Sequence, residues 1–292
     1  MFSGSLVAIV TPMRADGAVD YTAWTPLLDF HLRNGTNGIV VGGTTGESGT
    51  LFEAELLELA ERACAFVKGR VPVIVGAGTS STASTTQRVQ ALASLPIDGL
   101  LVVTPAYVRP TQEGLYRHFA AVAEVASTPV ILYNVPARTA VDMLPATVAR
   151  LAQLPRVRAI KEAVADMTRV RELVANCGDD FIVLSGDDPT AREAMLAGAR
   201  GVISVTANVA PQAMADMIAA AARGDLATAQ RIDAMLAPLH RDLFLEPNPI
   251  PAKWALLQMG LIERGIRLPL TELASEHHAE LTEVLRMVGV LQ

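Results

Sequence analysis

The sequence has 292 residues, of which 51% are hydrophobic and 18% charged, and this composition excludes a disordered chain, a collagen-like fibre and a disulfide-stapled miniprotein. The formal net charge of −6 provides no basic field for nucleic acid, and two cysteines, Cys64 and Cys177, are too few for a disulfide framework or a zinc site. No apolar run approaches the ~18 residues of a membrane span, and the residues after Met1 lack the basic region of a signal peptide. We therefore expect a soluble cytoplasmic protein that binds neither nucleic acid nor a membrane.

Eight short β-branched runs predict the strands of a parallel sheet. Each run is apolar almost throughout, as is typical of strands buried on both faces. The runs begin near Leu6, Gly38, Val71, Gly99, Pro129, Val157, Asp180 and Gly201. Their starts are 21 to 33 residues apart, which leaves room for one helix between consecutive strands. Eight such units predict an α/β fold, a (β/α)8 TIM barrel. An open, doubly wound sheet is the alternative, but no G-x-G-x-x-G loop follows any predicted strand.

The segments between the strands have the periodicity of amphipathic helices. Apolar residues from Trp24 to Leu32 recur at helical spacing, and we expect Asp20 to cap the helix that they form. Thr50 and Glu53 have the spacing of a capping box at the start of the next helix.

No strand-like run follows residue 223. Helices are predicted around residues 226–236, 249–260 and 271–288, and the proline-rich run 246–251 reads as a rigid connection between two of them. We therefore predict two domains, a catalytic barrel over residues 1–223 and a C-terminal helical domain over residues 224–292.

One lysine stands out as a candidate nucleophile. Functional side chains of such barrels gather at the carboxyl ends of the strands, and Lys161 lies near the end of the sixth predicted strand. Period-2 alternation turns Lys161 away from the side of Ile160 and into the barrel. Burial disfavours the ammonium form and lowers the pKa of the lysine, which makes its amine a nucleophile toward a carbonyl. The alternative is a structural ion pair of Lys161 with Glu162 or Asp187.

Three further candidate site features lie at or just after the carboxyl ends of predicted strands. Tyr133 lies at the matching height of the fifth strand, where a phenol can shuttle protons, although a lone tyrosine is more often a core residue. The loop 42–48 (GGTTGES) offers N–H groups and hydroxyls to a small carboxylate, or is only a tight turn before a helix. Arg138 suits a second carboxylate through its planar fork, or is an ordinary surface arginine.

Taken together, four motifs resemble those of the dihydrodipicolinate synthase family, which belongs to the Schiff-base aldolase and N-acetylneuraminate lyase superfamily. They are residues 43–47 (GTTGE), 133–139 (YNVPART), 160–163 (IKEA) and 185–188 (SGDD). Residues 104–116, 201–209 and 246–254 match the family pattern too, so the resemblance runs over nearly the whole chain. It implies the condensation of pyruvate with L-aspartate 4-semialdehyde to 4-hydroxy-tetrahydrodipicolinate, in diaminopimelate and lysine biosynthesis.

The resemblance implies the catalytic roles. Lys161 forms a Schiff base with pyruvate, and Tyr133 relays protons. Thr44 links Tyr133 to Tyr107, which reaches in from a neighbouring subunit. A homotetramer made of two tight dimers is implied by the resemblance alone.

The resemblance also implies the binding roles. The Thr45 hydroxyl and nearby N–H groups hold the pyruvate carboxylate, while Gly186 and the Ile203 backbone line the pocket. Arg138 receives the carboxylate of the aldehyde substrate. No metal and no organic cofactor is expected, because the lysine itself is the electron sink.

The sequence departs from the family pattern at one place. Many members have two consecutive tyrosines after Thr-Pro, whereas here Ala106 precedes Tyr107. In lysine-inhibited members this face carries effector contacts. The corresponding positions here are Ser48, Gly49, Glu53, Leu56, Ser80, Ser84 and Ala106. Loss of an aromatic wall and of polar partners weakens binding, so we predict weak or absent feedback inhibition by lysine. The strength of the tight dimer is open for the same reason.

Three alternatives share parts of this pattern. A sister lyase for sialic acid or 2-keto-3-deoxy sugar acids would keep Lys161 and Tyr133, but Arg138 and Thr45 suit an aldehyde that carries a carboxylate. A catalytically silent keto-acid-binding barrel would have lost one of the catalytic residues. A phosphate-binding isomerase would have glycine-rich anion sites after the last two strands, where residues 187–188 are acidic.

Overall fold

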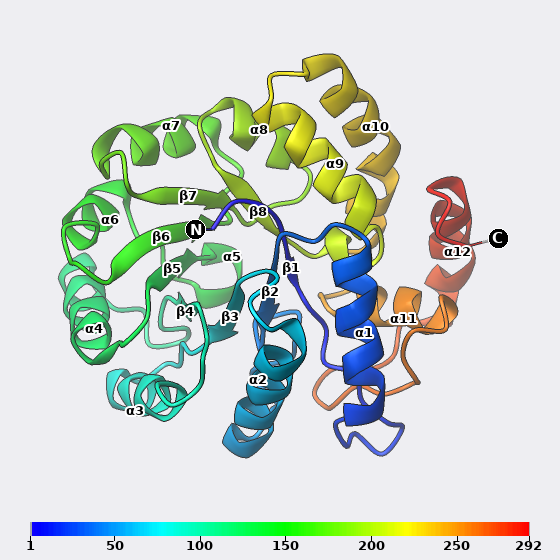
Figure 1. Ribbon diagram of the computed structural model, residues 1–292, viewed down its shortest axis with the longest axis horizontal. Coiled ribbons are helices and arrows are strands. Elements are labelled where there is room, and N and C mark those ends of the chain that lie inside the picture. The colour runs from blue at the N-terminus through cyan, green and yellow to red at the C-terminus, as the bar shows by residue number, and fades with distance from the viewer. Residues whose placement is uncertain (1, 292) are drawn as a thin grey trace.

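The computed structural model describes residues 2–291, and its eight parallel strands form one closed barrel in chain order (Figure 1). The strands are β1 (Gly4–Ala8), β2 (Gly38–Val41), β3 (Val73–Gly76), β4 (Gly99–Val103), β5 (Val130–Asn134), β6 (Val157–Glu162), β7 (Ile182–Ser185) and β8 (Gly201–Ser204). β1 pairs with β8 as well as with β2, and Gly4 is the register partner of Gly201. This pairing closes the sheet, confirms the predicted barrel and excludes the open sheet.

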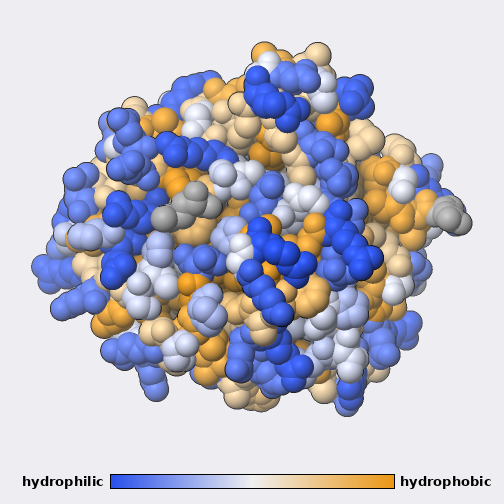
Figure 2. All heavy atoms as spheres, in the orientation of Figure 1, coloured by the Kyte–Doolittle hydropathy of each residue, from blue (hydrophilic) through white to orange (hydrophobic). Residues whose placement is uncertain are grey.

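Helices surround the ring of strands (Figure 1). They are α1 (Tyr21–Arg33), α2 (Glu53–Val67), α3 (Thr82–Leu92), α4 (Gln112–Val125), α5 (Pro136–Thr139), α6 (Pro145–Leu151), α7 (Met167–Asn176), α8 (Ala191–Leu196), α9 (Pro211–Ala222), α10 (Leu226–Asp242), α11 (Ile250–Gln258) and α12 (His278–Met287), with 3-10 turns η1 (Thr206–Asn208) and η2 (Ser275–His277). On the face that Figure 2 shows, hydrophilic and apolar residues are interspersed over these helices. This is typical of helices whose apolar stripe faces inward.

The predicted helix starts are correct in one case and wrong in another. The Asp20 side chain caps α1 by accepting from the N–H groups of Thr22 and Ala23. The capping box at Thr50 and Glu53 is wrong, because the observed box lies two residues later: the N–H of Phe52 donates to the Glu55 carboxylate (2.8 Å). The Thr50 hydroxyl instead donates to the carbonyl of Glu47 (3.1 Å), since it belongs to the turn that precedes the helix.

The barrel separates two apolar layers. Inward side chains such as Leu6, Ala159 and Ile203 form a core inside the barrel, whereas outward ones such as Val7 and Ile160 pack against the helices. Side chains along β6 alternate between the two layers: Ala159 points inward, Ile160 points outward, and Lys161 points inward again.

The C-terminal helices pack on the barrel helices. α10 lies against α9 and α12, and α11 lies against η1 and α12. Their buried residues Leu236, Leu256 and Leu281 belong to the same continuous apolar layer as the barrel helices. The division into domains at residues 223 and 224 stays a prediction. Among the described helices, none has the length and apolar character that crossing a membrane requires.

Candidate active site

Lys161 and Tyr133 meet inside the barrel at the carboxyl ends of β6 and β5. The two residues are register partners, and only 5% of Lys161 and 6% of Tyr133 is exposed. The Lys161 Nζ lies 4.4 Å from the centre of the Tyr133 ring. A buried amine beside a phenol can add to a carbonyl while the phenol exchanges the protons that the addition requires.

Neither of the two acidic residues considered as ion-pair partners contacts Lys161. Glu162 lies on the other side of β6 and pairs with Arg169 (Nε–Oε2 2.8 Å). Asp187 accepts a hydrogen bond from the Thr190 hydroxyl (2.6 Å). Within residues 2–291 no carboxylate pairs with Lys161, and this favours a reactive amine over a structural ion pair.

Gly186 leaves the space that Lys161 occupies. A Cβ at position 186 would lie 2.9 Å from the Lys161 Cε and 3.0 Å from its Cγ. Ile203 on β8 is 1% exposed and belongs to the same inner core as Tyr133. The two residues expected to line the site therefore belong to the barrel interior that holds Lys161.

The loop 42–48 brings Thr45 into the interior. Gly42 adopts a φ of 61°, and a Cβ there would lie 2.2 Å from the Leu56 Cδ1. Leu56 is buried under the loop, with 2% exposed, and the side chain therefore does not lie on the surface where the family resemblance placed it among the effector positions. Thr45 is buried, whereas Thr44 is half-buried. In the part of the chain that the structure describes, no hydrogen bond joins Thr44 to Tyr133, and their link stays a prediction.

Asn248 is a site residue that the sequence pattern did not reveal. Its Nδ2 donates to the Thr45 Oγ1 (3.0 Å), and its carbonyl accepts from the Arg138 Nη2 (3.1 Å). Because Asn248 already donates to the Thr45 oxygen, the Thr45 hydroxyl proton is directed toward a different acceptor, as binding a carboxylate requires. The sequence signals around it are the proline-rich run 246–251 and the family match of residues 246–254, neither of which indicates a role for Asn248 itself.

A buried ion pair fixes the same loop to the C-terminal helices. Lys253 on α11 pairs with Glu47, and the exposed fractions of the two side chains are 5% and 0%. Glu47 has a φ of 58°, a conformation that residues other than glycine adopt at a cost. Desolvation lowers the pKa of Lys253, and the charge of Glu47 opposes that shift. The loop that carries Thr45 is therefore held from the C-terminal end of the chain.

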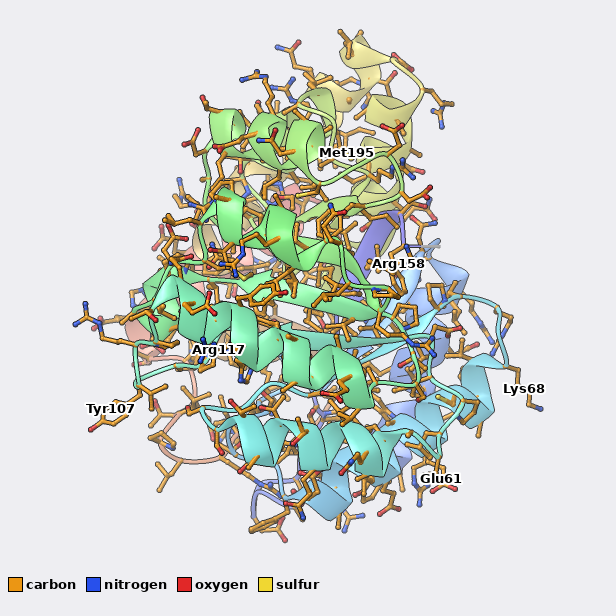
Figure 3. All side chains as sticks on the ribbon, turned by 90° about the vertical axis from the view of Figure 1, so that its left-hand side faces the viewer. Glu61, Lys68, Tyr107, Arg117, Arg158 and Met195 are labelled. Atoms are coloured by element: carbon orange, nitrogen blue, oxygen red, sulfur yellow. The ribbon has the colours of Figure 1, made fainter. Side chains whose placement is uncertain are left out.

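Two of the expected site residues lie at the surface. Arg138 is exposed, and one of its guanidinium nitrogens donates to the Asn248 carbonyl. Tyr107 is 92% exposed with a φ of 70°, and it projects from the loop between β4 and α4 (Figure 3). The site of one chain therefore lacks the second tyrosine that the sequence analysis assigned to it from a neighbouring subunit.

The histidines belong to the helix layer. His31 lies on α1 and His118 on α4, and burial lowers the pKa of His31 to about 3 and that of His118 to about 4. Residues 2–291 contain no group of three or more His, Cys, Asp or Glu side chains that could hold a metal ion.

Comparison with known proteins matches this architecture over its whole length. Residues 1–288 match the model of the dihydrodipicolinate synthetase family. A 4-hydroxy-tetrahydrodipicolinate synthase of Pseudomonas aeruginosa is 53% identical over 291 residues, which covers 100% of both chains. The crystal structure of a chloride-inhibited dihydrodipicolinate synthase from Acinetobacter baumannii complexed with pyruvate has a TM-score of 0.98, 46% identity and 100% coverage of both chains. A lysine-bound enzyme from Cyanidioschyzon merolae has a TM-score of 0.96 and 35% identity, with 99% of each chain covered.

Proposed function

The chain belongs to the dihydrodipicolinate synthetase family, and we propose that Lys161 carries the reaction of that family. The reaction condenses pyruvate with L-aspartate 4-semialdehyde to 4-hydroxy-tetrahydrodipicolinate, and it makes the protein a lyase of diaminopimelate and lysine biosynthesis. The observation that carries the proposal is the buried Lys161 amine, 4.4 Å from the Tyr133 ring and free of any carboxylate partner among the described residues.

The first half of the reaction activates pyruvate. The neutral Lys161 amine adds to the ketone carbon, and the carbinolamine loses water to give a protonated imine. Tyr133 passes the protons between the amine and the departing oxygen. The imine withdraws electrons, so a methyl proton of pyruvate is lost and a nucleophilic enamine forms. Thr45 holds the pyruvate carboxylate during these steps, with Gly186 and Ile203 around it.

The second half joins the two substrates. The enamine carbon attacks the aldehyde carbon, a C–C bond forms, and the resulting alkoxide takes up a proton. The amino group of the former semialdehyde then adds to the imine carbon and displaces the Lys161 amine, which closes the ring and frees the enzyme. Arg138 binds the semialdehyde carboxylate, since its guanidinium is exposed to solvent and is held on one side by its hydrogen bond to the Asn248 carbonyl.

Borohydride trapping tests the assignment of the nucleophile. Reduction in the presence of pyruvate should fix one pyruvate-derived group on the peptide that contains Lys161, as read by mass spectrometry. Lys161→Ala should abolish both the adduct and turnover, and Lys161→Arg should do the same while it keeps the positive charge. An adduct on another lysine, or turnover that survives in Lys161→Ala, would refute the proposal.

Steady-state kinetics test the choice of the second substrate. Turnover with L-aspartate 4-semialdehyde should far exceed turnover with sialic acid or deoxy sugar acids. Arg138→Ala should raise the KM of the aldehyde strongly and leave the KM of pyruvate close to that of the parent protein, because removal of one carboxylate contact affects one substrate. Equal effects on both substrates would contradict this role of Arg138.

We also propose a homotetramer of two tight dimers in which Tyr107 completes the neighbouring site. Support comes from the exposed Tyr107 and Val108, which are 92% and 56% accessible in one chain. Mixing Lys161→Ala subunits with Tyr107→Phe subunits tests this, because a mixed dimer has one site with both residues intact. Random reassociation should restore about one quarter of parental activity. If no activity returns although mixed dimers form, Tyr107 does not act across the interface.

The proposed location is the cytoplasm. Cys64 is half-buried and Cys177 is buried, both are free, and free thiols persist in a reducing compartment. Fractionation of cells that produce the protein should recover it with soluble cytoplasmic markers, and recovery with an exported fraction would refute the proposal.

A further inference from the structure

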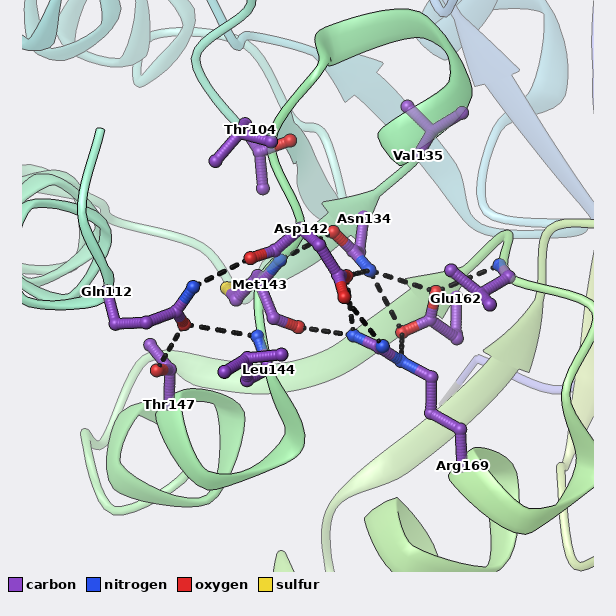
Figure 4. A network of polar contacts seen from close by, with 12 residues as sticks. Thr104, Gln112, Asn134, Val135, Asp142, Met143, Leu144, Thr147, Glu162 and Arg169 are labelled. Carbon is purple, nitrogen blue, oxygen red and sulfur yellow. Dashed lines mark hydrogen bonds and ion pairs between the residues drawn. The ribbon is translucent and has the colours of Figure 1, made fainter. Parts of the chain in front are cut away.

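A second polar cluster lies directly behind Lys161 and Tyr133, on the side of the strands that faces the helices. Asn134 and Glu162 are the next residues along β5 and β6 and are register partners themselves. Since successive strand residues point to opposite faces, the amine and the phenol face the barrel interior, while the amide and the carboxylate face outward. The Asn134 Nδ2 lies 3.1 and 3.2 Å from the two carboxylate oxygens of Glu162 (Figure 4). This contact joins the two strands at the height of the site.

Every partner of the Glu162 carboxylate is a donor. The Val164 N–H donates to Oε1 (3.0 Å) and the Arg169 Nε donates to Oε2 (2.8 Å), in addition to the Asn134 amide. The Glu162 side chain is fully buried; desolvation raises its pKa, and Arg169 and these hydrogen bonds oppose the shift. A proton on either oxygen would point at a donor, so the surroundings hold the ionised carboxylate in one orientation.

Arg169 extends the cluster to Asp142. Its Nη1 and Nη2 lie 2.9 and 2.7 Å from the Asp142 carboxylate. The Asn134 Nδ2 also donates to Asp142 (2.8 Å), and the Met143 N–H donates to the Asn134 Oδ1 (3.0 Å). With both ends of its amide bonded, Asn134 cannot rotate, and the position of Glu162 follows from it.

Packing alone does not require a charged cluster at this place. The outward residues Ile160 and Val183 show that an apolar side chain suffices between strand and helix. A buried ion cluster adds little net stability compared with apolar packing, but it admits only one arrangement of its members. Such a device is useful where the position of the backbone, rather than its stability, limits function.

We propose that Glu162 is a positioning residue for the reaction, which fixes the height and direction of the Lys161 amine relative to Tyr133. The inference rests on the proposed function, in which Lys161 is the Schiff-base lysine. Glu162→Gln places an amide NH2 among donors, so the end of β6 must shift to relieve the conflict. A displacement of about 1 Å lowers the rate of a well-oriented step by about 100-fold. Binding of the pyruvate carboxylate depends on Thr45 instead and should change by less than about threefold.

The test measures the single-turnover rate of borohydride-trapped pyruvate on Lys161, together with the Kd of pyruvate and the Tm. Asp233→Asn is the control for the loss of a carboxylate–arginine pair away from the site, because Asp233 pairs with Arg192 (2.9 Å) between α10 and α8, with side chains 19% and 21% exposed. We expect the control to trap at the parental rate and Glu162→Gln to trap about 100-fold more slowly with a nearly unchanged Kd. Arg169→Lys, which keeps the charge but loses the bidentate bond to Asp142, should give an intermediate rate and serves if Glu162→Gln does not fold.

Trapping at the parental rate in Glu162→Gln or Arg169→Lys, with only the Tm lowered, would overturn the inference, since it would show a structural role alone. If the parental protein itself forms no adduct on Lys161, the proposed function fails instead. The two failures are therefore distinguishable in one experiment.

Discussion

The ion pair between Lys253 and Glu47 predicts a strong coupling between the last helices and the loop that carries Thr45. Both side chains are almost completely buried, so water does not screen the pair. Lys253→Met would leave the Glu47 carboxylate without its cation, and removal of one member of a buried pair costs about 3–5 kcal/mol of unfolding free energy. The Glu47 Oε2 keeps a long bond from the Arg267 N–H (3.2 Å), and the Arg267 guanidinium, which pairs with Glu55, still attracts Glu47 through space, so we expect a cost at the lower end of that range.

A double-mutant cycle measures this coupling. Glu47→Gln combined with Lys253→Met removes both charges and leaves a neutral acceptor for Arg267, so the double variant should be less destabilised than Lys253→Met alone. The coupling free energy should be at least about 2 kcal/mol in urea unfolding followed by circular dichroism. The exposed i,i+4 pair of Arg62 and Glu58 serves as the control, with an expected coupling of about 0.3–0.5 kcal/mol. Additive effects of the two buried substitutions would refute the reasoning.

Three other predictions concern the site, acid stability and regulation. Gly186→Ala should lower kcat about 100-fold, because the new Cβ would lie 2.9 Å from the Lys161 Cε; unchanged borohydride trapping would contradict this. His31 has a pKa of about 3 when folded, so stability is complete above the unfolded pKa of ~6.5 and falls as the pH drops toward 3. The part of the loss at pH 5 that belongs to His31 should be about 2 kcal/mol in urea unfolding, and His31→Leu should remove that part, while His118, whose pKa burial lowers to about 4, still contributes. Ala106 stands where many family members have a tyrosine at the expected effector face, so inhibition by lysine should be weak or absent. An inhibition curve that saturates at sub-millimolar lysine would disprove this.

The sequence predicts the barrel well because its strands are marked locally. Short apolar runs such as 38–41 and 201–204 need no long-range information, and the predicted starts lie within two residues of the observed ones. The inward direction of Lys161 follows from alternation along the single strand β6. The capping box was displaced because two pairs three residues apart, Thr50 with Glu53 and Phe52 with Glu55, compete at the same helix start.

The rest of the site depends on contacts between distant parts of the chain. Asn248 and Thr45 are 203 residues apart, and no local pattern in residues 246–251 indicates that the Asn248 amide reaches the Thr45 hydroxyl. The same holds for Lys253, whose partner Glu47 is 206 residues away. The burial of Leu56 follows from helical periodicity, because it lies on the apolar face of α2 with Leu59 and Ala63, whereas its close approach to Gly42 could not be read from the sequence.

The bond between Asn248 and Thr45 also has a consequence for the timing of biosynthesis. A ribosome translates the chain from its N-terminus, so the hydroxyl at position 45 emerges long before the amide that orients it. All eight strands of the barrel are therefore translated before Asn248. The partner that orients the Thr45 hydroxyl is thus supplied only near the end of translation, after Lys161 and all eight strands have been made.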